Sequence, residues 1–400
     1  MTPAFPQPPQ DPDERPAQRR RVFTCGCLGC GGLFFFLGMA LLIVSAVPDP
    51  LVLGIAAVAA ILPVPLFTFL VLQLDRYEHE PWQVLTAAFL WGALVATFIA
   101  AILNSAIGEV LAAQFGEALG EVATSSVVAP IVEETAKGFA LLLLYWIVRH
   151  EFDNVLDGIV YGSLVGIGFA MTENILYFGR TIQSDGLAGL GLLFYLRVFL
   201  GGFGHALYTG TIGAGLGFAR ETHRRWLIPL IVPGAYILGV LQHASWNFLA
   251  ATVVPALLPE SLSPLILLFV VMPLTSMVLM APGLLALMVI AILAWRREKG
   301  VIQEHLLDEV AQGVLSEEEY LRLPSQRGRM RAEWAALRRI GLRGFFAQRD
   351  LHQAATGLAF RKWHLSRGER PKRAQRRQPE EQFRQHIAIH RTHLRTPEDR

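Results

Sequence analysis

Apolar runs long enough to cross a lipid bilayer occupy most of the first 294 residues of this chain. Charged residues are almost absent from the stretches 33–74, 84–103, 123–148 and 154–178. About 20 consecutive apolar residues span the hydrocarbon core as a helix, and such a segment must satisfy its backbone hydrogen bonds internally. Charged residues make up 17% of the chain, whereas about a quarter of the residues in a soluble domain are charged. The sequence therefore predicts an all-α, polytopic transmembrane bundle.

The composition divides the chain into three regions. Residues 1–21 are rich in proline and charge and are expected to form a disordered arm. Residues 22–294 are expected to hold about eight transmembrane helices, and residues 295–400 a basic, partly helical cytoplasmic tail. The expected helices cover approximately residues 28–47, 51–74, 84–103, 124–148, 154–178, 195–219, 227–250 and 264–294. Pro273 and Pro282 break the last block, so a single crossing and a hairpin both stay open.

Basic residues predict the orientation of the bundle. If each apolar block crosses once, Arg180 is the only arginine in a loop on one side. The arginines that fall on the other side are Arg19, Arg20, Arg21, Arg76, Arg149, Arg220, Arg224, Arg225, Arg296 and Arg297. Because cytoplasmic loops carry the excess of basic residues, both chain termini are expected in the cytoplasm.

The tail is strongly basic. From Arg296 onward the chain holds 23 lysines and arginines against 14 acidic residues. A basic segment beside a membrane is expected to contact anionic lipid or a cytosolic regulator. No nucleic-acid-binding motif is present, so nucleic acid is not expected as a partner.

Several ionisable and amide side chains lie within the otherwise apolar runs. They are Glu133, Glu134, Lys137, Glu173, Asn174, His205, His243 and Asn247. A charge at the bilayer centre costs about 3 kcal/mol on insertion scales. Of the eleven histidines, only His205 and His243 fall in apolar spans. These residues therefore predict a buried polar site within the lipid bilayer.

The motif PIVEETAKG carries the densest charge. Lys137 lies three residues after Glu134 and four after Glu133, so on a helix it can pair with either glutamate. Adjacent helical residues project about 100° apart, so one glutamate can act while the other fixes the geometry. A positioned carboxylate suits a general base. The alternatives are a structural ion pair between helices and a gating pair in a transporter.

Three further motifs follow on later helices. In GFAMTENILYF, Glu173 is a buried acid beside the amide of Asn174. Upstream, a GxxxGxxxG stripe over residues 158–166 lets another helix approach closely. The other two motifs are GGFGHALYTG, which contains His205, and LQHASWNFLA, which places Asn247 one turn after His243.

The polar residues are expected at a common depth. At about 1.5 Å per residue, Glu134 lies about ten residues inside the outer end of its helix, Glu173 about six and His243 about seven. All three positions fall in the outer half of the bilayer. The site is therefore expected to open toward the extracytoplasmic side.

His205 reaches the same depth only if its helix begins near residues 195–198. The preceding segment, 187–196, is therefore predicted to be re-entrant or interfacial. Arg197 is expected near the outer boundary of the bilayer.

These four motifs, in this order on successive helices, resemble the PrsW family of intramembrane proteases. The family pattern has a Glu-Glu-x-x-Lys helix, a Phe-Ala-x-x-Glu-Asn helix, a helix with one His, and a helix with His followed by Asn or Asp. The matching residues are Glu133, Glu134, Lys137, Phe169, Ala170, Glu173, Asn174, His205, His243 and Asn247. The loop DRYEHEPW also resembles a family segment, and the likeness covers about residues 72–250.

The resemblance implies a peptidase of the bacterial cytoplasmic membrane. Its substrate would be a single-pass membrane protein, such as an anti-sigma factor, cut near the extracytoplasmic side in an envelope-stress response. The family is distantly similar to the CAAX-processing membrane proteases, which share a paired-glutamate helix.

Peptide hydrolysis requires an activated water and a stabilised oxyanion. On this hypothesis Glu133 or Glu134 is the base, and Lys137 and Glu173 tune its charge. The residues expected to orient the water and donate to the oxyanion are Asn174, His205, His243 and Asn247. In a competing zinc version, the metal ligands would be Glu134, Glu173, His205 and His243.

A proton-coupled transporter with a buried Glu/His relay is the alternative function. Transporters often show repeated halves, and no internal repeat is visible in this sequence. A non-catalytic scaffold would not retain so many costly polar groups.

Overall fold

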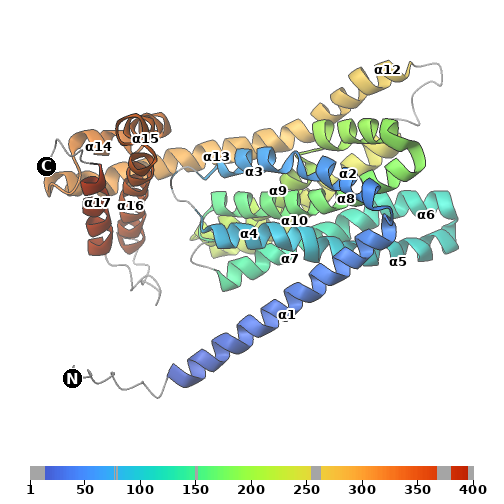
Figure 1. Ribbon diagram of the computed structural model, residues 1–400, viewed down its shortest axis with the longest axis horizontal. Helices are drawn as coiled ribbons and strands as arrows, with labels where there is room; N and C mark the ends of the chain where they lie inside the picture. Colours follow the sequence, from blue (N-terminus) through green and yellow to red (C-terminus); the bar gives the residue numbers. More distant parts are fainter. Residues whose placement is uncertain are drawn as a thin grey trace.

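A computed structural model describes residues 14–75, 77, 80–148, 152–253, 263–366 and 380–394, which form helices joined by short connections, with no strand among them (Figure 1). The α-helices of the apolar part are α1 (Glu14–Ala46), α2 (Pro50–Ile61), α3 (Val64–Leu72), α4 (Trp82–Leu90), α5 (Thr97–Phe115), α6 (Glu117–Ala123), α7 (Ala129–Ile147), α8 (Val155–Phe194), α9 (Gly204–Glu221), α10 (Ile228–Ser245), α12 (Pro264–Ile266) and α13 (Met272–Ala311). Short π- or 3-10-helical segments are η1 (Trp91–Ala96), η2 (Thr124–Val128), η3 (Tyr195–Leu200), η4 (Arg225–Leu227), η5 (Trp246–Val253) and η6 (Leu267–Val271). The tail adds α14 (Glu317–Arg322), α15 (Gln326–Ile340), α16 (Leu342–Ser366) and α17 (Glu380–His393). The predicted all-α architecture is confirmed.

Five helical stretches of the described residues are long and apolar enough to cross a membrane. They are Pro50–Leu72, Trp82–Phe115, Val155–Glu221, Arg225–Leu249 and Pro264–Ala311. The stretch Val155–Glu221 contains two long helices, α8 and α9, that pack side by side. The chain is therefore a helical bundle with several membrane-spanning segments.

Some helix boundaries differ from the expected ones. α1 begins at Glu14, inside the arm expected to be disordered, and residues 1–13 lie outside the described residues. α5 continues to Phe115 because Gly116, with φ of 86°, is the first residue that turns the chain back. Pro264–Ala311 is one continuous helical stretch, so the hairpin that the sequence left open is wrong.

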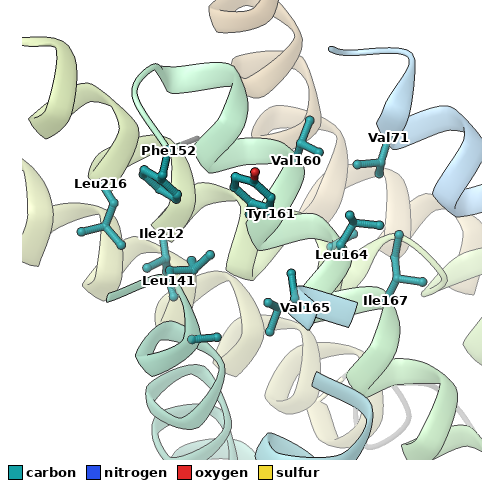
Figure 2. Close-up of a cluster of buried hydrophobic side chains, with 13 residues drawn as sticks. Val71, Leu141, Phe152, Val160, Tyr161, Leu164, Val165, Ile167, Ile212 and Leu216 are labelled. Carbon is teal, nitrogen blue, oxygen red and sulfur yellow. The ribbon is translucent and has the colours of Figure 1, made fainter. Parts of the chain in front are cut away.

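α8 is the central helix of the bundle. Every residue from Val155 to Phe169 is buried. Figure 2 shows Tyr161 and Val165 of this helix among apolar side chains that include Leu141 of α7 and Ile212 of α9. A helix that is apolar on all sides is covered by neighbours on all sides. The later residues of α8 are thereby fixed relative to α7 and α9.

The glycine stripe predicted as a packing motif joins α8 to α9. A Cβ atom built on Gly158, Gly162 or Gly166 would lie 2.0 to 2.4 Å from a carbonyl oxygen of α9. No side chain fits at such a separation, so the two backbones are in direct contact. Gly166 lies against the carbonyl oxygen of His205, at 2.2 Å from the built Cβ. The stripe therefore sets the position of His205 against α8.

Replacing Gly166 with alanine is expected to lower the free energy of unfolding by about 1–3 kcal/mol, because the added methyl forces α9 away from α8. The matched control is Gly234→Ala in α10, where no atom lies within 4 Å of a built Cβ. That control should be neutral or gain up to about 1 kcal/mol of helix propensity. Unfolding in detergent measures both, and equal effects of the two substitutions would contradict the close packing.

After Gly186 the chain folds back along α8. The helix kinks at this residue, whose φ and ψ are 68° and −160°. The ring of Phe194 then lies 6.0 Å from that of Phe178, and Val198 packs in the same apolar cluster as Ile175. Residues 187–200 thus form a helical segment that lies antiparallel to the end of α8, as a re-entrant segment would.

The helix that carries His205 begins later than expected. α9 starts at Gly204, whereas the depth argument placed its start near 195–198. The difference arises because η3 (Tyr195–Leu200) belongs to the returning segment, and a turn over 201–203 separates it from α9. His205 therefore lies in the first turn of its helix.

The tail is a folded helical unit. α13 runs without a break from the apolar part into this unit (Figure 1). Its core is apolar and includes Ile302, Leu306, Leu315, Leu351, Ala355 and Leu358. Glu309 is buried there and pairs with Lys362 at 3.0 Å and with Arg384 at 2.7 Å. The tail therefore has its own core.

The tail docks on one end of the bundle. Tyr77, in the connection between α3 and α4, donates its hydroxyl to the carbonyl oxygen of Pro324 at 2.8 Å. The guanidinium carbon of Arg329 lies 4.6 Å from the centre of the Tyr77 ring. His364 of α16 lies 3.5 Å from Asp153, which precedes α8. The connection that contains Tyr77 and the connection that contains Asp153 therefore lie at the same end of the bundle, and the tail contacts both.

Candidate functional site

Lys137 lies at the centre of a buried polar network on α7. Its Nζ donates to Glu134 Oε1 at 2.7 Å and lies 3.5 Å from Glu133 Oε2, so it pairs with both glutamates. Nζ also lies 3.0 Å from His205 Nδ1 and 3.9 Å from the centre of the Phe169 ring. Lys137 and Glu134 are completely buried. Because removal of one buried charge leaves its partner uncompensated, these charges depend on one another.

Glu134 has every oxygen satisfied. Oε1 accepts from Lys137 and from His243 Nδ1, the latter at 3.0 Å, and Oε2 accepts from the Thr209 hydroxyl at 2.8 Å. Since a carboxylate only accepts, Nδ1 of His243 carries the proton in this contact. In a neutral ring, the free lone pair is then on Nε2. Glu134 therefore orients His243, and both of its oxygens already accept hydrogen bonds.

His205 connects α7 to α8. Lys137 can only donate, so Nδ1 of His205 accepts from it, and Nε2–H donates to Glu173 Oε2 at 3.0 Å. Arg197 of the returning segment pairs with Glu173, and its Nε donates to Asn174 Oδ1 at 2.6 Å. The side chains of Glu173 and Arg197 are 15% and 24% exposed, in contrast to Glu134. This side of the site is therefore the accessible one.

Glu133 differs from Glu134 in having an unsatisfied oxygen. Oε1 accepts from Asn104 Nδ2 at 3.3 Å. Oε2 is buried and has no hydrogen-bond partner among the described residues. It lies 3.9 Å from Nε2 of His243. Two acceptors with free lone pairs thus face each other, an arrangement that favours a shared water or cation.

Three of these residues form a group that can hold a metal ion. One ligand atom each of Glu133, His205 and His243 lies within 4.8 Å of the others. Two imidazoles and a carboxylate, with a fourth position open, make up a common catalytic zinc set. The zinc hypothesis drawn from the sequence named Glu134 and Glu173. In the structure, Glu133 lies with the two histidines in the group that can hold a metal. Both oxygens of Glu134 instead accept hydrogen bonds from Lys137, His243 and Thr209.

The predicted site residues fall into two groups. Those joined in one contact network are Glu133, Glu134, Lys137, Glu173, His205 and His243. Asn174 is attached to it through Arg197. Asn247 instead donates to the carbonyl oxygen of Ser125 at 2.9 Å, which ties η5 to η2. Both amides thus fix helices in place, and their expected role as oxyanion donors has no contact here to support it.

Four polar residues of the site were missed in the sequence. They are Asn104, Arg197, Tyr208 and Thr209. Tyr208 and Thr209 lie three and four residues after His205, so helical spacing alone places them near its face. The Tyr208 ring stacks on His243 at 4.9 Å, and its buried hydroxyl has no partner among the described residues. Arg197 carried the same signal as the glutamates, a charge within an apolar run.

Comparisons with known proteins find a family model and several relatives that match this chain. The family model described as PrsW family intramembrane metalloprotease matches residues 80–279. A protein named Protease PrsW from Geobacillus kaustophilus is 30% identical over 183 residues, which cover 44% of this chain and 74% of the relative. Protease PrsW from Bacillus subtilis is 30% identical over 185 residues, covering 44% and 73%. Protease PrsW from Clostridioides difficile is 34% identical over 119 residues, covering 30% and 48%.

No solved structure matches this chain. The matched region includes α4 to α10, and thus every residue of the contact network. The comparisons decide between the protease and transporter hypotheses in favour of the protease. With its paired-glutamate helix and the two histidine-bearing helices in the matched region, the chain belongs to the PrsW family of intramembrane proteases.

Proposed function

We propose that this chain is an intramembrane endopeptidase in which Glu133 takes the proton of the attacking water. One observation carries the assignment. Glu133 Oε2 is a buried carboxylate oxygen without a hydrogen-bond partner among the described residues, 3.9 Å from His243 Nε2. A water held between these two acceptors gives one proton to the carboxylate as its oxygen attacks the peptide carbonyl carbon.

The neighbouring residues keep Glu133 and His243 in place. Glu134 holds Nδ1 of His243, so that Nε2 faces Glu133. Lys137, at 3.5 Å from Glu133 Oε2, offsets the negative charge of the pair. Thr209 fixes the second oxygen of Glu134. These contacts preorganise the site before substrate arrives.

The tetrahedral intermediate requires a donor for its oxyanion. The Tyr208 hydroxyl is a buried donor with no partner among the described residues, and its ring is fixed by stacking on His243. A phenol hydroxyl can serve as such a donor. In the second half of the reaction, the proton held by Glu133 passes to the peptide nitrogen as the carbon–nitrogen bond breaks.

The family description names a metal, and the residues present fit one. One ligand atom each of Glu133, His205 and His243 lies within 4.8 Å of the others, and Glu133 has a buried oxygen with no hydrogen-bond partner among the described residues. These three residues would hold the ion. To bind the ion through Nδ1, His205 would give up its hydrogen bond with Lys137. When bound, zinc makes its water a stronger acid, so that hydroxide is available near neutral pH.

The substrate is proposed to be a single-pass membrane protein, such as an anti-sigma factor, cut near the extracytoplasmic side. Depth supports this side. Measured from the tail-side ends of their helices, Glu134 lies 13 residues from Ile147 and Glu173 lies 18 residues from Val155. These lengths correspond to about 20–27 Å of a core about 30 Å thick. The site would thus lie in the half of the membrane opposite the tail.

The proposal is tested by reconstituting the purified chain with membrane-anchored anti-sigma factors encoded near its gene. The expected result is one cut, mapped by mass spectrometry to the extracytoplasmic side of the substrate helix. Strong chelation decides which role Glu133 has: activity that is lost on chelation and restored by one zinc per chain would make Glu133 a metal ligand in place of the base. Activity that survives chelation would refute the metal. Failure to cut any single-pass protein would refute the function.

A further inference from the structure

Arg197 joins the returning segment to the contact network. It lies in η3, and its guanidinium meets three residues of α8. Nη2 pairs with Glu173 Oε2, and Nε donates to Asn174 Oδ1 at 2.6 Å. The guanidinium carbon lies 4.2 Å from the centre of the Tyr177 ring. These partners are adjacent or one turn apart, so a single side chain attaches this part of α8 to the returning segment.

The contacts of Arg197 require the shape of a guanidinium as well as its charge. Nε and Nη2 are two donors in one rigid plane, and they reach acceptors on two consecutive residues, Glu173 and Asn174. The ammonium of a lysine has a single nitrogen on a flexible stem and does not reproduce this fork. Arg197 therefore fixes the direction of the Glu173 carboxylate in addition to offsetting its charge.

The Glu173 oxygen that pairs with Arg197 also holds His205. Nε2–H of His205 donates to Oε2 at 3.0 Å. On the other side of the ring, Nδ1 accepts from Lys137 at 3.0 Å. The hydrogen bond made by one ring nitrogen decides which nitrogen keeps its lone pair. A carboxylate that accepts from one nitrogen is the usual support of a histidine that acts through the other.

The charge of Glu173 depends on Arg197. The Glu173 side chain is only 15% exposed. Within the described ranges its ion-pair partners are Arg197 and His205, and of these only the arginine is always charged. Lys137 pairs with the two glutamates of α7 instead. Because a largely buried carboxylate without a cation is costly, loss of the arginine should turn Glu173 toward solvent and away from His205.

We propose that Arg197 is a positioning residue, a role that rests on the proposed peptidase function. It holds Glu173, Glu173 holds Nε2–H of His205, and Nδ1 of that ring stays directed at the centre of the network. No hydrogen bond or ion pair joins Arg197 to Glu133 or His243 in the part of the chain that the structure describes. The arginine thus acts on the reacting groups through Glu173, and the docked returning segment is part of the assembled site.

Arg197→Gln is expected to lower kcat and kcat/KM equally, by about 10–100-fold, the usual cost of removing the support of a functional histidine. Arg197→Lys keeps the charge but not the fork, so its kcat should lie between those of Arg197→Gln and the parent. The matched control is Arg180→Gln, which removes an exposed arginine two turns after Glu173 on α8 and should cleave like the parent. A higher KM at unchanged kcat would overturn the proposal, because Arg197 would then bind substrate.

A double variant decides whether Arg197 acts through Glu173. If it does, adding Arg197→Gln to Glu173→Gln should change kcat by less than about twofold, since the contact is already lost. Effects that multiply would overturn the proposal. Arg197 would then only fasten the returning segment through Asn174 and Tyr177.

The position of His205 can also be measured without any substrate. In the full chain with ¹⁵N-labelled histidines, the Nε2–H signal of His205 is assigned with His205→Gln. That proton should be protected from exchange with water in the parent and in Arg180→Gln, and should exchange rapidly in Arg197→Gln. Unchanged protection in Arg197→Gln would overturn the proposal. A parent chain that cleaves no substrate would instead refute the peptidase function, and the signal would still report whether Arg197 positions His205.

Discussion

Glu133→Gln is expected to reduce cleavage of a single-pass substrate by about 10²–10⁴-fold, the usual contribution of a general base. Glutamine has the same shape and can still accept from Asn104 through its amide oxygen. It cannot take a proton from water at the position of Oε2. The variant should therefore lose less stability than Glu134→Gln, because Lys137 keeps its shorter ion pair with Glu134, while the rate falls. Purified protein, substrate and a melting curve in the same detergent measure both properties.

Glu134→Gln is the matched control for this prediction. Its oxygens hold Lys137, His243 and Thr209. The amide removes the negative charge at this position, so Lys137 keeps only the longer ion pair with Glu133. This variant should lose stability as well as activity. The assignment is contradicted if Glu134→Gln has the melting temperature of the parent but no activity, while Glu133→Gln cleaves normally. Glu134 would then be the base, and Glu133 the residue that fixes the geometry.

The residues of the network could be predicted from the sequence because a membrane makes polar residues costly. Glu133, Glu134, Lys137, Glu173 and both intramembrane histidines stood out on energy alone, and all six meet in the structure. Their pairing could not be predicted. A helix places Lys137 near either glutamate, and only the neighbouring helices decide that Glu134 is saturated and Glu133 is not.

Uncharged polar residues of the site were harder to predict from the sequence than the charged ones. Thr209 and Tyr208 are common in packed transmembrane helices, so nothing in their type separates a site residue from a packing one. The glycine stripe predicted that another helix approaches α8 closely. The sequence did not predict which residues of α9 the stripe contacts. The start of α9 was misjudged because the returning segment 187–200 is itself helical and apolar.

The tail was the least predictable part. Its sequence indicated short helices, and the structure shows a unit with its own core docked on Tyr77. That core draws on residues far apart in the chain, from Val301 to Ile387. Local patterns within short helices cannot reveal such contacts.

Lys137→Met is expected to lower the free energy of unfolding by about 3–5 kcal/mol, because it leaves buried carboxylates without their cation. Lys137 is completely buried and lies within 3.5 Å of both glutamates. It also accounts for the acceptor role of His205 Nδ1. Activity should be lost together with stability. Denaturant titration in mixed micelles measures the loss against the parent chain.

The double variant Glu134→Gln, Lys137→Met distinguishes a charge effect from a packing effect. Removing both members of a buried pair is often close to neutral, whereas removing one is costly. The double variant should therefore recover most of the stability that Lys137→Met loses, although it stays inactive because Glu133 lacks its compensating cation. If the double variant were less stable than Lys137→Met alone, the lysine would act through its contact with the Phe169 ring and its volume, not through charge. Stability regained without activity would show that Glu134 and Lys137 together serve the reaction as well as the fold.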